Sequence, residues 1–298
     1  MDKLLSESDV STEVDCIVGA LRTWLSGNDR AVIALSGGLD SDVTARLVVR
    51  AIGRERVKVF TVIQDDMDPR HLANARKLAV DLDAPLAEVD LTGFPERFMT
   101  AMSDADPREN FLPTGLLDPA RAKCSLRTVA LSTYQDRGYV VVGTSNRTEL
   151  ETGFFLPLGD GIWHIGPIVH LYKSEIFRLA PVLGTRKEVI EQPPSAGFWQ
   201  GQEDLEDLSY WLLNAGPIGK EREFTDDDDE AVRKIRESLT AERVDKALLA
   251  FSLGGNAQQA SLSSGLPQSI AARLEELVQR AKPLKQRPFG QRLPNRAK

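Results

Sequence analysis

The sequence predicts an α/β protein with a doubly wound parallel sheet and a helical C-terminal region. Apolar runs of strand length alternate with segments of helical period over the first half of the chain. A glycine-rich loop joins the first of these strands directly to a helix. Beyond about residue 205 the pattern is helical throughout. We therefore expect ligands to bind outside the carboxyl ends of the strands.

A first amphipathic helix is predicted at about 12–26, where Ile17, Leu21 and Leu25 repeat at helical spacing before Gly27. Cys16 is expected to pack on its apolar face. The next predicted elements are strands at 31–35, 57–63, 86–91 and 139–142 and helices at 42–52, 70–82 and 118–138. In the helix at 118–138, Asp118 is expected to be the N-cap and Pro119 the first helical residue. The stretch 92–118 is long and irregular, which is typical of a functional or mobile loop.

The C-terminal third is predicted to contain helices at 205–214, 227–238, 240–252 and 267–281. Four successive acids at 226–229 fit a helix N-terminus, where negative charge complements the helix dipole. The basic, proline-containing tail at 282–288 is expected to be extended. These patterns divide the chain into an α/β domain at 1–212 and a helical extension at 213–298.

Composition excludes several classes of protein. The 37 Lys and Arg residues against 44 Asp and Glu give a net charge of −7, which argues against nucleic-acid binding. No apolar run reaches the length of a membrane span, and residues 1–7 do not resemble a signal peptide. The two cysteines, Cys16 and Cys124, are far apart and fit neither a zinc site nor a disulfide framework. We expect a cytoplasmic enzyme with no membrane or nucleic-acid partner.

The glycine-rich loop reads Ser36-Gly37-Gly38-Leu39-Asp40-Ser41. Its glycines allow a sharp turn and a close approach to a ligand, because they carry no Cβ. Its hydroxyls and amides, placed at a helix N-terminus, suit the binding of phosphate oxygens. The loop lacks the Lys-Ser/Thr ending of the Walker type, so it is a different phosphate-binding device. The alternative is a simple turn between a strand and a helix.

The loop resembles the pyrophosphate loop of the PP-loop ATP pyrophosphatases, which cleave ATP between its α and β phosphates. Further blocks follow it in order, at Gly143 to Leu150, Gly159-Asp160-Gly161, Pro167-Ile168, Leu171-Tyr172-Lys173 and Pro194 to Gln202. Together they resemble the ammonia-dependent NAD synthetases over roughly residues 12–212. This resemblance implies an adenine nucleotide alpha hydrolase-like fold, and it leaves open a divergent paralogue within the family.

The resemblance also implies roles for individual residues. The ATP-binding residues would be Ser36, Gly37, Gly38, Asp40, Ser41 and Thr144. Asp40 and Glu149 would bind Mg²⁺, a hard cation that prefers carboxylate oxygens. Lys173 and Ser195, with Asp40, would act near the reacting groups. The alternatives are a helix cap for Asp40, surface charges for Glu149 and Lys173, and a turn residue for Ser195.

The implied reaction has two steps. A substrate carboxylate attacks the α-phosphate of ATP and releases pyrophosphate, and ammonia then converts the acyl-adenylate to an amide and AMP. No stretch resembles a glutaminase, so ammonia is expected to be free or delivered by a separate subunit. Family members pair as homodimers, and the apolar face of the helix at 119–137 is a candidate for burial in such a pair.

The sequence departs from the family where the carboxylate substrate would bind. Asp160 is retained, but His164 stands where a second aspartate is usual. Arg121 replaces a family asparagine, Ser125 replaces an arginine, and Arg127 is retained. Substrate binding would therefore involve Asp160, His164, Arg121 and Arg127. An Asp-to-His exchange replaces an acceptor with a group that can donate, and a pocket based on hydrogen bonds is sensitive to such changes.

Three functions remain open at this stage. The first is NAD synthesis from nicotinic acid adenine dinucleotide. The second is amidation of another carboxylate in specialised metabolism, favoured by the departures at Arg121, Ser125 and His164. The third is nucleotide binding without catalysis. A thiolating enzyme of the same loop class would need a partner for Cys124, which is expected instead to pack within its helix.

Overall fold

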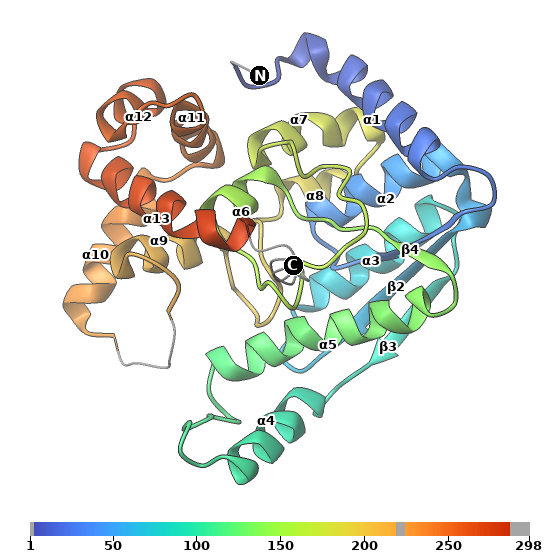
Figure 1. Ribbon diagram of the computed structural model, residues 1–298, viewed down its shortest axis with the longest axis horizontal. Helices are drawn as coiled ribbons and strands as arrows, with labels where there is room; N and C mark the ends of the chain where they lie inside the picture. The colour runs from blue at the N-terminus through green and yellow to red at the C-terminus, as the bar shows by residue number, and fades with distance from the viewer. Residues whose placement is uncertain (1–2, 219–223, 287–298) are drawn as a thin grey trace, which may run out of the picture.

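The computed structural model describes residues 3–218 and 224–286 and confirms the α/β fold class (Figure 1). Its sheet contains β1 (Arg30–Ala34), β2 (Val57–Ile63), β3 (Leu86–Asp90) and β4 (Tyr139–Val141). The strands are parallel in the order β3-β2-β1-β4, with Ala31 paired to Val57 on one side and Val140 on the other. The two central strands are almost wholly buried, as expected for a sheet covered on both faces.

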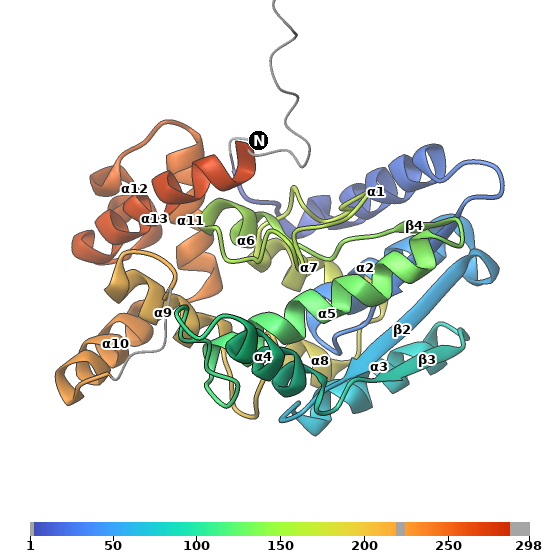
Figure 2. The ribbon, with the colours of Figure 1, turned by 60° about the horizontal axis from the view of Figure 1, so that its bottom comes forward.

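Helices cover both faces of the sheet (Figures 1 and 2). One core contains side chains of α1 (Val10–Trp24), α2 (Leu39–Ile52), α3 (Pro69–Asp81), α7 (Lys173–Leu183) and α8 (Lys187–Glu191) together with Ile33 and Val59 of the sheet. On the opposite face, α5 (Leu117–Gln135) packs against Val32 and Phe60. The doubly wound arrangement predicted from the sequence is therefore present.

The strand order fixes where a ligand can bind. From β1 the chain moves outward to β2 and β3, and it later returns to place β4 on the other side of β1. The connections after β1 and β4 therefore diverge from neighbouring strands at the carboxyl edge, which creates a crevice. Residues 36–41 follow β1, and the short helix α6 (Arg147–Thr152) follows β4.

The C-terminal region is helical, as predicted. It contains α9 (Asp204–Asn214), α10 (Asp226–Ser238), α11 (Ala241–Ser252), α12 (Ala257–Ser264) and α13 (Gln268–Gln286). The division proposed after residue 212 falls inside the last turn of α9, and α9 shares a core with the helices beyond it through Leu208 and Leu212. Tyr172, which directly precedes α7, also belongs to this core. The acidic run begins α10 as expected, where Thr225 and Asp228 form a capping box.

Several local predictions were wrong. The stretch 92–118 is not all irregular, because α4 (Phe94–Ala105) begins within it with Pro95 in its first turn, where proline is tolerated. Asp118 does not cap α5; the cap position is Leu116, and the Asp118 carboxylate accepts a hydrogen bond from the Leu112 amide. Cys16 is exposed, because it lies one residue away from the buried stripe of α1.

The basic tail was expected to be extended, but residues 282–286 continue α13, and 287–288 lie outside the described residues. Helices α6, α7, α8 and α12 were not predicted. Two short 3₁₀ helices, at Glu7–Asp9 and Arg54–Arg56, complete the secondary structure described here. No helix within 3–218 and 224–286 is long and apolar enough to cross a membrane.

Candidate active site

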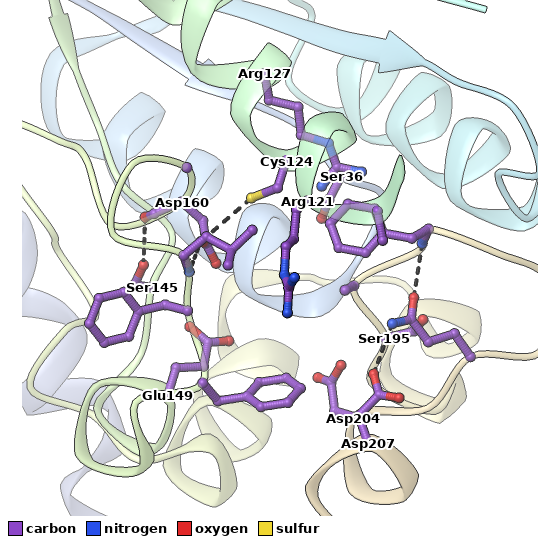
Figure 3. A pocket seen from close by; sticks show the side chains of 18 of the residues that line it. Ser36, Arg121, Cys124, Arg127, Ser145, Glu149, Asp160, Ser195, Asp204 and Asp207 are labelled. Atoms are coloured by element: carbon purple, nitrogen blue, oxygen red, sulfur yellow. Dashed lines mark hydrogen bonds between the residues drawn. The ribbon is translucent and has the colours of Figure 1, made fainter. Parts of the chain in front are cut away.

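A cavity of about 850 Å³ opens at the carboxyl edge of the sheet (Figure 3). It lies between the loops after β1 and β4, the start of α5 and the segment that leads into α9. Eight predicted site residues line it: Ser36, Asp40, Thr144, Glu149, Asp160, Arg121, Arg127 and Ser195. The structure thus brings together residues that are up to about 160 positions apart in the sequence, which matches the crevice expected from the strand order.

The loop after β1 is held by its own hydrogen bonds at the start of α2. The Ser41 hydroxyl accepts a hydrogen bond from the Ser36 amide (3.2 Å) and donates one to the Gly38 carbonyl (2.9 Å). The Gly38 amide donates to the Ser36 hydroxyl (3.2 Å). Gly37, Gly38 and Ser41 do not themselves line the cavity, so in this structure they shape the loop that presents Ser36 and Asp40 to it.

Gly37 is required by close packing as well as by backbone conformation. Its φ is +79°, and a Cβ there would lie 1.9 Å from the carbonyl oxygen of His71 on α3. His71 is buried, and its Nδ1 lies 3.0 Å from the Ser36 carbonyl oxygen. Asn74 donates to the side-chain oxygen of Gln192 (2.8 Å), which also contacts His71 through its amide. This small network fixes the loop against α3.

Sequence reasoning missed His71, Asn74 and Gln192. A signal for the first two was present, because His71 and Asn74 occupy the same helical stripe as Ala75 and Leu78. Polar side chains on an otherwise apolar face need partners inside the protein. Here those partners belong to the loop at 36–41 and to Gln192.

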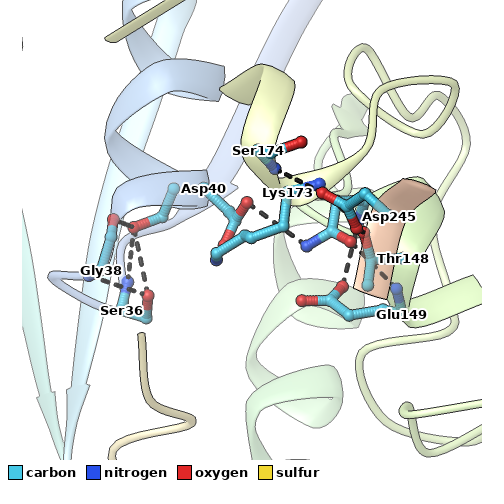
Figure 4. A network of polar contacts seen from close by, with 10 residues as sticks. Ser36, Gly38, Asp40, Thr148, Glu149, Lys173, Ser174 and Asp245 are labelled. Carbon is cyan, nitrogen blue, oxygen red and sulfur yellow. Dashed lines mark hydrogen bonds and ion pairs between the residues drawn. The ribbon is translucent and has the colours of Figure 1, made fainter. Parts of the chain in front are cut away.

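Lys173 and Asp40 form an ion pair beside this loop (Figure 4). Their side chains are only 11% and 17% exposed, and the side-chain amide of Asn146 donates a hydrogen bond to Asp40 (3.4 Å). Burial alone would lower the pKa of Lys173, but the charges of Asp40 and Asp204 outweigh it, and the pKa is raised. Lys173 does not itself line the cavity, but it is held as a cation against Asp40, which does.

Glu149 lies in the first turn of α6, where its carboxylate accepts a hydrogen bond from the Asn146 amide in a capping box. Burial and the nearby charge of Asp40 raise the pKa of Glu149 well above its usual range. Two carboxylates beside one lysine favour the arrival of a further cation, and their oxygens suit Mg²⁺. Across 3–218 and 224–286 no group of three or more His, Cys, Asp or Glu side chains is placed to hold a metal alone. Mg²⁺ is commonly bound through one or two carboxylates together with substrate phosphates, and Asp40 and Glu149 provide such a pair.

Two further acids, Asp204 and Asp207, line the cavity from the first turn of α9 (Figure 3). Burial raises the pKa of Asp204 to about 6, although Lys173 opposes the shift. Burial also raises the pKa of Asp207 to about 7, although Gln202 donates a hydrogen bond to it (2.8 Å). Neither was predicted as a site residue, because acids in the first turn of a helix are ordinary.

The predicted substrate residues make specific contacts around the cavity. The Arg127 guanidinium lies over the ring of Phe198, 4.8 Å from its centroid. Arg121 donates to the carbonyl oxygen of Ile218 (2.6 Å). Asp160 accepts hydrogen bonds from the Leu156 amide (2.8 Å) and from the Cys124 thiol. Cys124 is buried, as expected for a packing residue.

Ser195 combines its predicted position at the cavity with the alternative role of a turn residue. Its hydroxyl accepts a hydrogen bond from the Gly197 amide (3.0 Å), which stabilises the turn after Pro194. The same residue lines the cavity. The turn and the position at the site are therefore compatible.

The structure does not bring His164 to the cavity. Its side chain is exposed, and its Nδ1 accepts a hydrogen bond from the Val141 amide (2.9 Å). The His164 amide in turn donates to the Val141 carbonyl (3.0 Å). His164 thus satisfies polar groups on the outer edge of β4, which would otherwise be an open strand edge.

Comparison with known proteins agrees with this geometry. A family model for NAD synthase matches residues 12–250. The chain belongs to the NAD synthase family. It is 34% identical over 203 residues to the NH₃-dependent NAD⁺ synthetase of Methanococcoides burtonii, covering 67% of this chain and 75% of that protein. It is 29% identical over 269 residues to the NH₃-dependent NAD⁺ synthetase of Pyrococcus horikoshii, and the match covers 89% of this chain and 88% of that protein.

Solved structures show the same fold. The NMN synthetase of Francisella tularensis has a TM-score of 0.69 at 23% identity and covers 98% of this chain and 99% of its own. The NH₃-dependent NAD synthetase of Campylobacter jejuni has a TM-score of 0.65 at 20% identity, and the match covers 97% of this chain and 100% of that chain. As a family member, this chain is an AMP-forming carbon–nitrogen ligase that uses ATP to make an amide.

The packing of Gly37 gives a first prediction. Gly37→Ala should weaken ATP binding at least tenfold, because the new Cβ would displace the His71 backbone and the loop with it. Gly27→Ala is the matched control, since Gly27 also has positive φ but open space around its Cβ position. Calorimetric titration with ATP measures both. Equal affinity in the two variants would contradict a role for close packing.

The raised pKa of Asp207 gives a second prediction. A carboxyl that titrates near pH 7 when folded and near pH 4 when unfolded binds more protons in the folded state between these values. Its contribution to the free energy of unfolding therefore falls as the pH rises from about 4 to about 7. Asp207→Asn removes this contribution, so the free energy of unfolding should change in the positive direction relative to the wild type as the pH rises through this window.

Urea denaturation at several pH values measures this dependence. Glu206→Gln is the control, because Glu206 is an exposed acid in the same helical turn. If Asp207→Asn leaves the pH dependence of the free energy of unfolding unchanged, this carboxyl titrates normally.

Proposed function

We propose that this chain makes NAD from nicotinic acid adenine dinucleotide, with ATP and ammonia as co-substrates. One observation carries the proposal: Asp40, Glu149 and Lys173 converge beside the phosphate loop at the carboxyl edge of the sheet. Joining a carboxylate to a polyphosphate brings two anions together, so the site needs cations at the point of attack. Membership of the NAD synthase family and the similarity to NH₃-dependent synthetases support the same reaction.

Each group has a role in this proposal. Ser36 binds phosphate oxygens from the loop that Gly37, Gly38 and Ser41 shape, and Lys173 neutralises charge near the reacting phosphate. Asp40 and Glu149 would hold Mg²⁺, which offsets charge on the leaving pyrophosphate. Thr144 contacts the nucleotide, and Ser195 lies near the reacting carboxylate. Arg121, Arg127 and Asp160 surround the acid that is to be amidated.

Ammonia is proposed to come from solution or from a separate glutaminase. The glutamine-dependent NAD⁺ synthetase of Acinetobacter baumannii has a TM-score of 0.59, and this chain covers 48% of it. The matched half corresponds to nearly all of the present chain, 97% of its length.

The identity of the acid is tested by AMP release with ammonia across a panel of carboxylates. We expect nicotinic acid adenine dinucleotide to be the best substrate. The panel should include nicotinic acid mononucleotide, because the Francisella tularensis protein is an NMN synthetase. A poor rate with the dinucleotide and a good rate with the mononucleotide would mean that the departures at Arg121 and Ser125 mark a changed substrate. That result, or the absence of AMP release with both acids, would refute the proposed substrate.

Removal of either proposed metal ligand gives a third prediction. Asp40→Asn and Glu149→Gln should each reduce pyrophosphate release at least 100-fold while the fold is retained, because each removes a carboxylate rather than a packing group. The two losses should be non-additive if both residues bind one ion. Steady-state assays over a range of Mg²⁺ concentrations measure this, with circular dichroism as the control for folding. Turnover like that of the wild type in either variant would remove the assignment.

We also propose that the chain forms a homodimer through the outer surface of α4 and α5. Figure 2 shows α5 lying across the sheet with α4 beside its N-terminal half. Exposed apolar side chains on and next to these helices are Phe94, Phe98, Leu116 and Val129, which are 45–59% exposed. Apolar side chains gathered on one surface are typical of a protein interface.

Val129→Glu gives a fourth prediction. A charge buried in an interface without a partner is costly, so this variant should shift the protein toward the monomer at micromolar concentration. Leu262→Glu is the control, because Leu262 on α12 is 81% exposed and far from these helices. Light scattering distinguishes the outcomes. A monomeric wild type with full activity would contradict the proposed dimer.

A further inference from the structure

We propose that Asp245, on the C-terminal helix α11, is a positioning residue that sets the relative placement of Lys173 and Glu149. This inference rests on the proposed function, since it concerns the geometry of the same site. Asp245 does not line the cavity. Its carboxylate instead joins the beginnings of α6 and α7, the two helices that carry Glu149 and Lys173 (Figure 4).

The Asp245 carboxylate accepts hydrogen bonds from both helices. One carboxylate oxygen accepts a hydrogen bond from the Thr148 hydroxyl (2.7 Å), and the other accepts one from the Ser174 amide (2.7 Å). The Thr148 hydroxyl in turn accepts a hydrogen bond from the Lys173 amide (2.9 Å). A hydroxyl has one proton to donate, and Thr148 gives it to Asp245, so its oxygen remains available to Lys173.

The residues that Asp245 holds are sequence neighbours of Glu149 and Lys173. Thr148 directly precedes Glu149, and Ser174 directly follows Lys173. One carboxylate therefore anchors the chain one residue away from each proposed site residue. A shift of α6 relative to α7 would break at least one of these hydrogen bonds. Misplacement of reacting groups by about 1 Å can reduce a rate about 100-fold.

The same contacts solve a capping problem. The first amides of a helix have no partner within the helix. In α7 the residue at the cap position, Tyr172, makes no side-chain capping hydrogen bond. The amides of Lys173 and Ser174 are satisfied instead by Thr148 of α6 and Asp245 of α11. The N-terminus of α7 is thus capped by side chains from two other helices, and a carboxylate there complements the helix dipole.

Stability alone does not call for an acid at this position. Asp245 is fully buried in a helix whose neighbouring residues Val244 and Leu248 belong to the C-terminal core. Burial raises the pKa of the Asp245 carboxyl to about 6, which reflects the cost of placing a charge there. An apolar side chain with apolar partners would be about as stable. The carboxylate is explained by what it holds, namely the amide of Ser174 and the hydroxyl of Thr148.

This arrangement gives the helical C-terminal region a role in the reaction. Helix α11 packs against both α6 and α7, while the phosphate loop lies on the opposite side of Lys173. The α/β domain supplies every group proposed to touch the substrates. The C-terminal region supplies the group that fixes the distance between two of them.

Two substitutions test the inference. Thr148→Val keeps the shape of the side chain and removes the hydroxyl, and Asp245→Asn replaces one acceptor by a donor that faces hydrogen-bond donors. Each should reduce kcat for AMP formation about 10- to 100-fold, the range found for groups that orient ligands of a metal site. The KM for ATP should change less than about threefold. Thr148→Ser keeps the hydroxyl and should retain at least about a third of the kcat.

The double variant Thr148→Val/Asp245→Asn should be no worse than the poorer single variant, because both break the same set of hydrogen bonds. Val244→Ala is the matched control, since it removes buried volume from the same helix without breaking these contacts. It should lower the free energy of unfolding and leave kcat within about twofold. Additive losses in the double variant, or an equal loss of kcat in Val244→Ala, would overturn the inference.

Amide hydrogen exchange provides a readout that does not depend on activity. Asp245→Asn should increase exchange at the start of α7 at least tenfold, whereas Val244→Ala should increase it only within the C-terminal helices. Unchanged exchange at Ser174 in Asp245→Asn would refute the anchoring contact. A wild type that releases no AMP with any carboxylate would refute the proposed function, and exchange would then decide the anchoring contact by itself.

Discussion

The divergence of the chain on the two sides of β1 is the constraint on which the site depends. Because β4 returns to the side of β1 opposite β2, the loops after β1 and β4 must leave the sheet next to each other. One loop begins α2 with Asp40 in its first turn, and the other begins α6 with Glu149 in its first turn. The start of α2 and the first turn of α6 therefore lie at one cavity, and the N-terminus of α2 is a favourable environment for the phosphates of a nucleotide.

Carboxylates dominate the charges around Lys173 at the cavity. Asp40, Glu149 and Asp204 surround the single lysine, and burial raises the pKa of both Glu149 and Asp204. ATP adds several more negative charges to this group. In the proposed function, Mg²⁺ held by Asp40 and Glu149 would offset these charges and favour the ionised form of the two carboxylates.

The sequence contained enough information to predict the sheet, the glycine-rich loop at 36–41 and eight of the residues that line the cavity. The sheet and the loop were predicted from local signals, such as the apolar run before Ser36 and the two glycines that follow it, whereas the other site residues were predicted from the family resemblance. Gly37 illustrates the limit of such signals. Its flexibility was evident from its residue type, but its close approach to His71 depends on how α3 packs.

The errors have the same origin. Cys16 was assigned to the wrong side of α1 because a helix turns by 100° per residue, and a pattern with several apolar residues defines its buried stripe only loosely. His164 matched a family position in order along the chain, yet its ring is used by the amide of Val141. Which partner a side chain finds depends on tertiary packing, and spacing along the sequence does not encode it.

Lys173 shows how a local element can be fixed by distant parts of the chain. Near the N-terminus, the Leu5 amide donates to Glu175, and the same carboxylate accepts a hydrogen bond from the Tyr172 amide (2.6 and 2.7 Å). The first turn of α7 is therefore held from both ends of the protein, by residue 5 through Glu175 and by α11 through Asp245. One anchor lies near the N-terminus and the other lies on α11, so the placement of Lys173 depends on the packing of both regions. The position of the Lys173 ammonium is thus a property of the whole fold rather than of helix α7 alone.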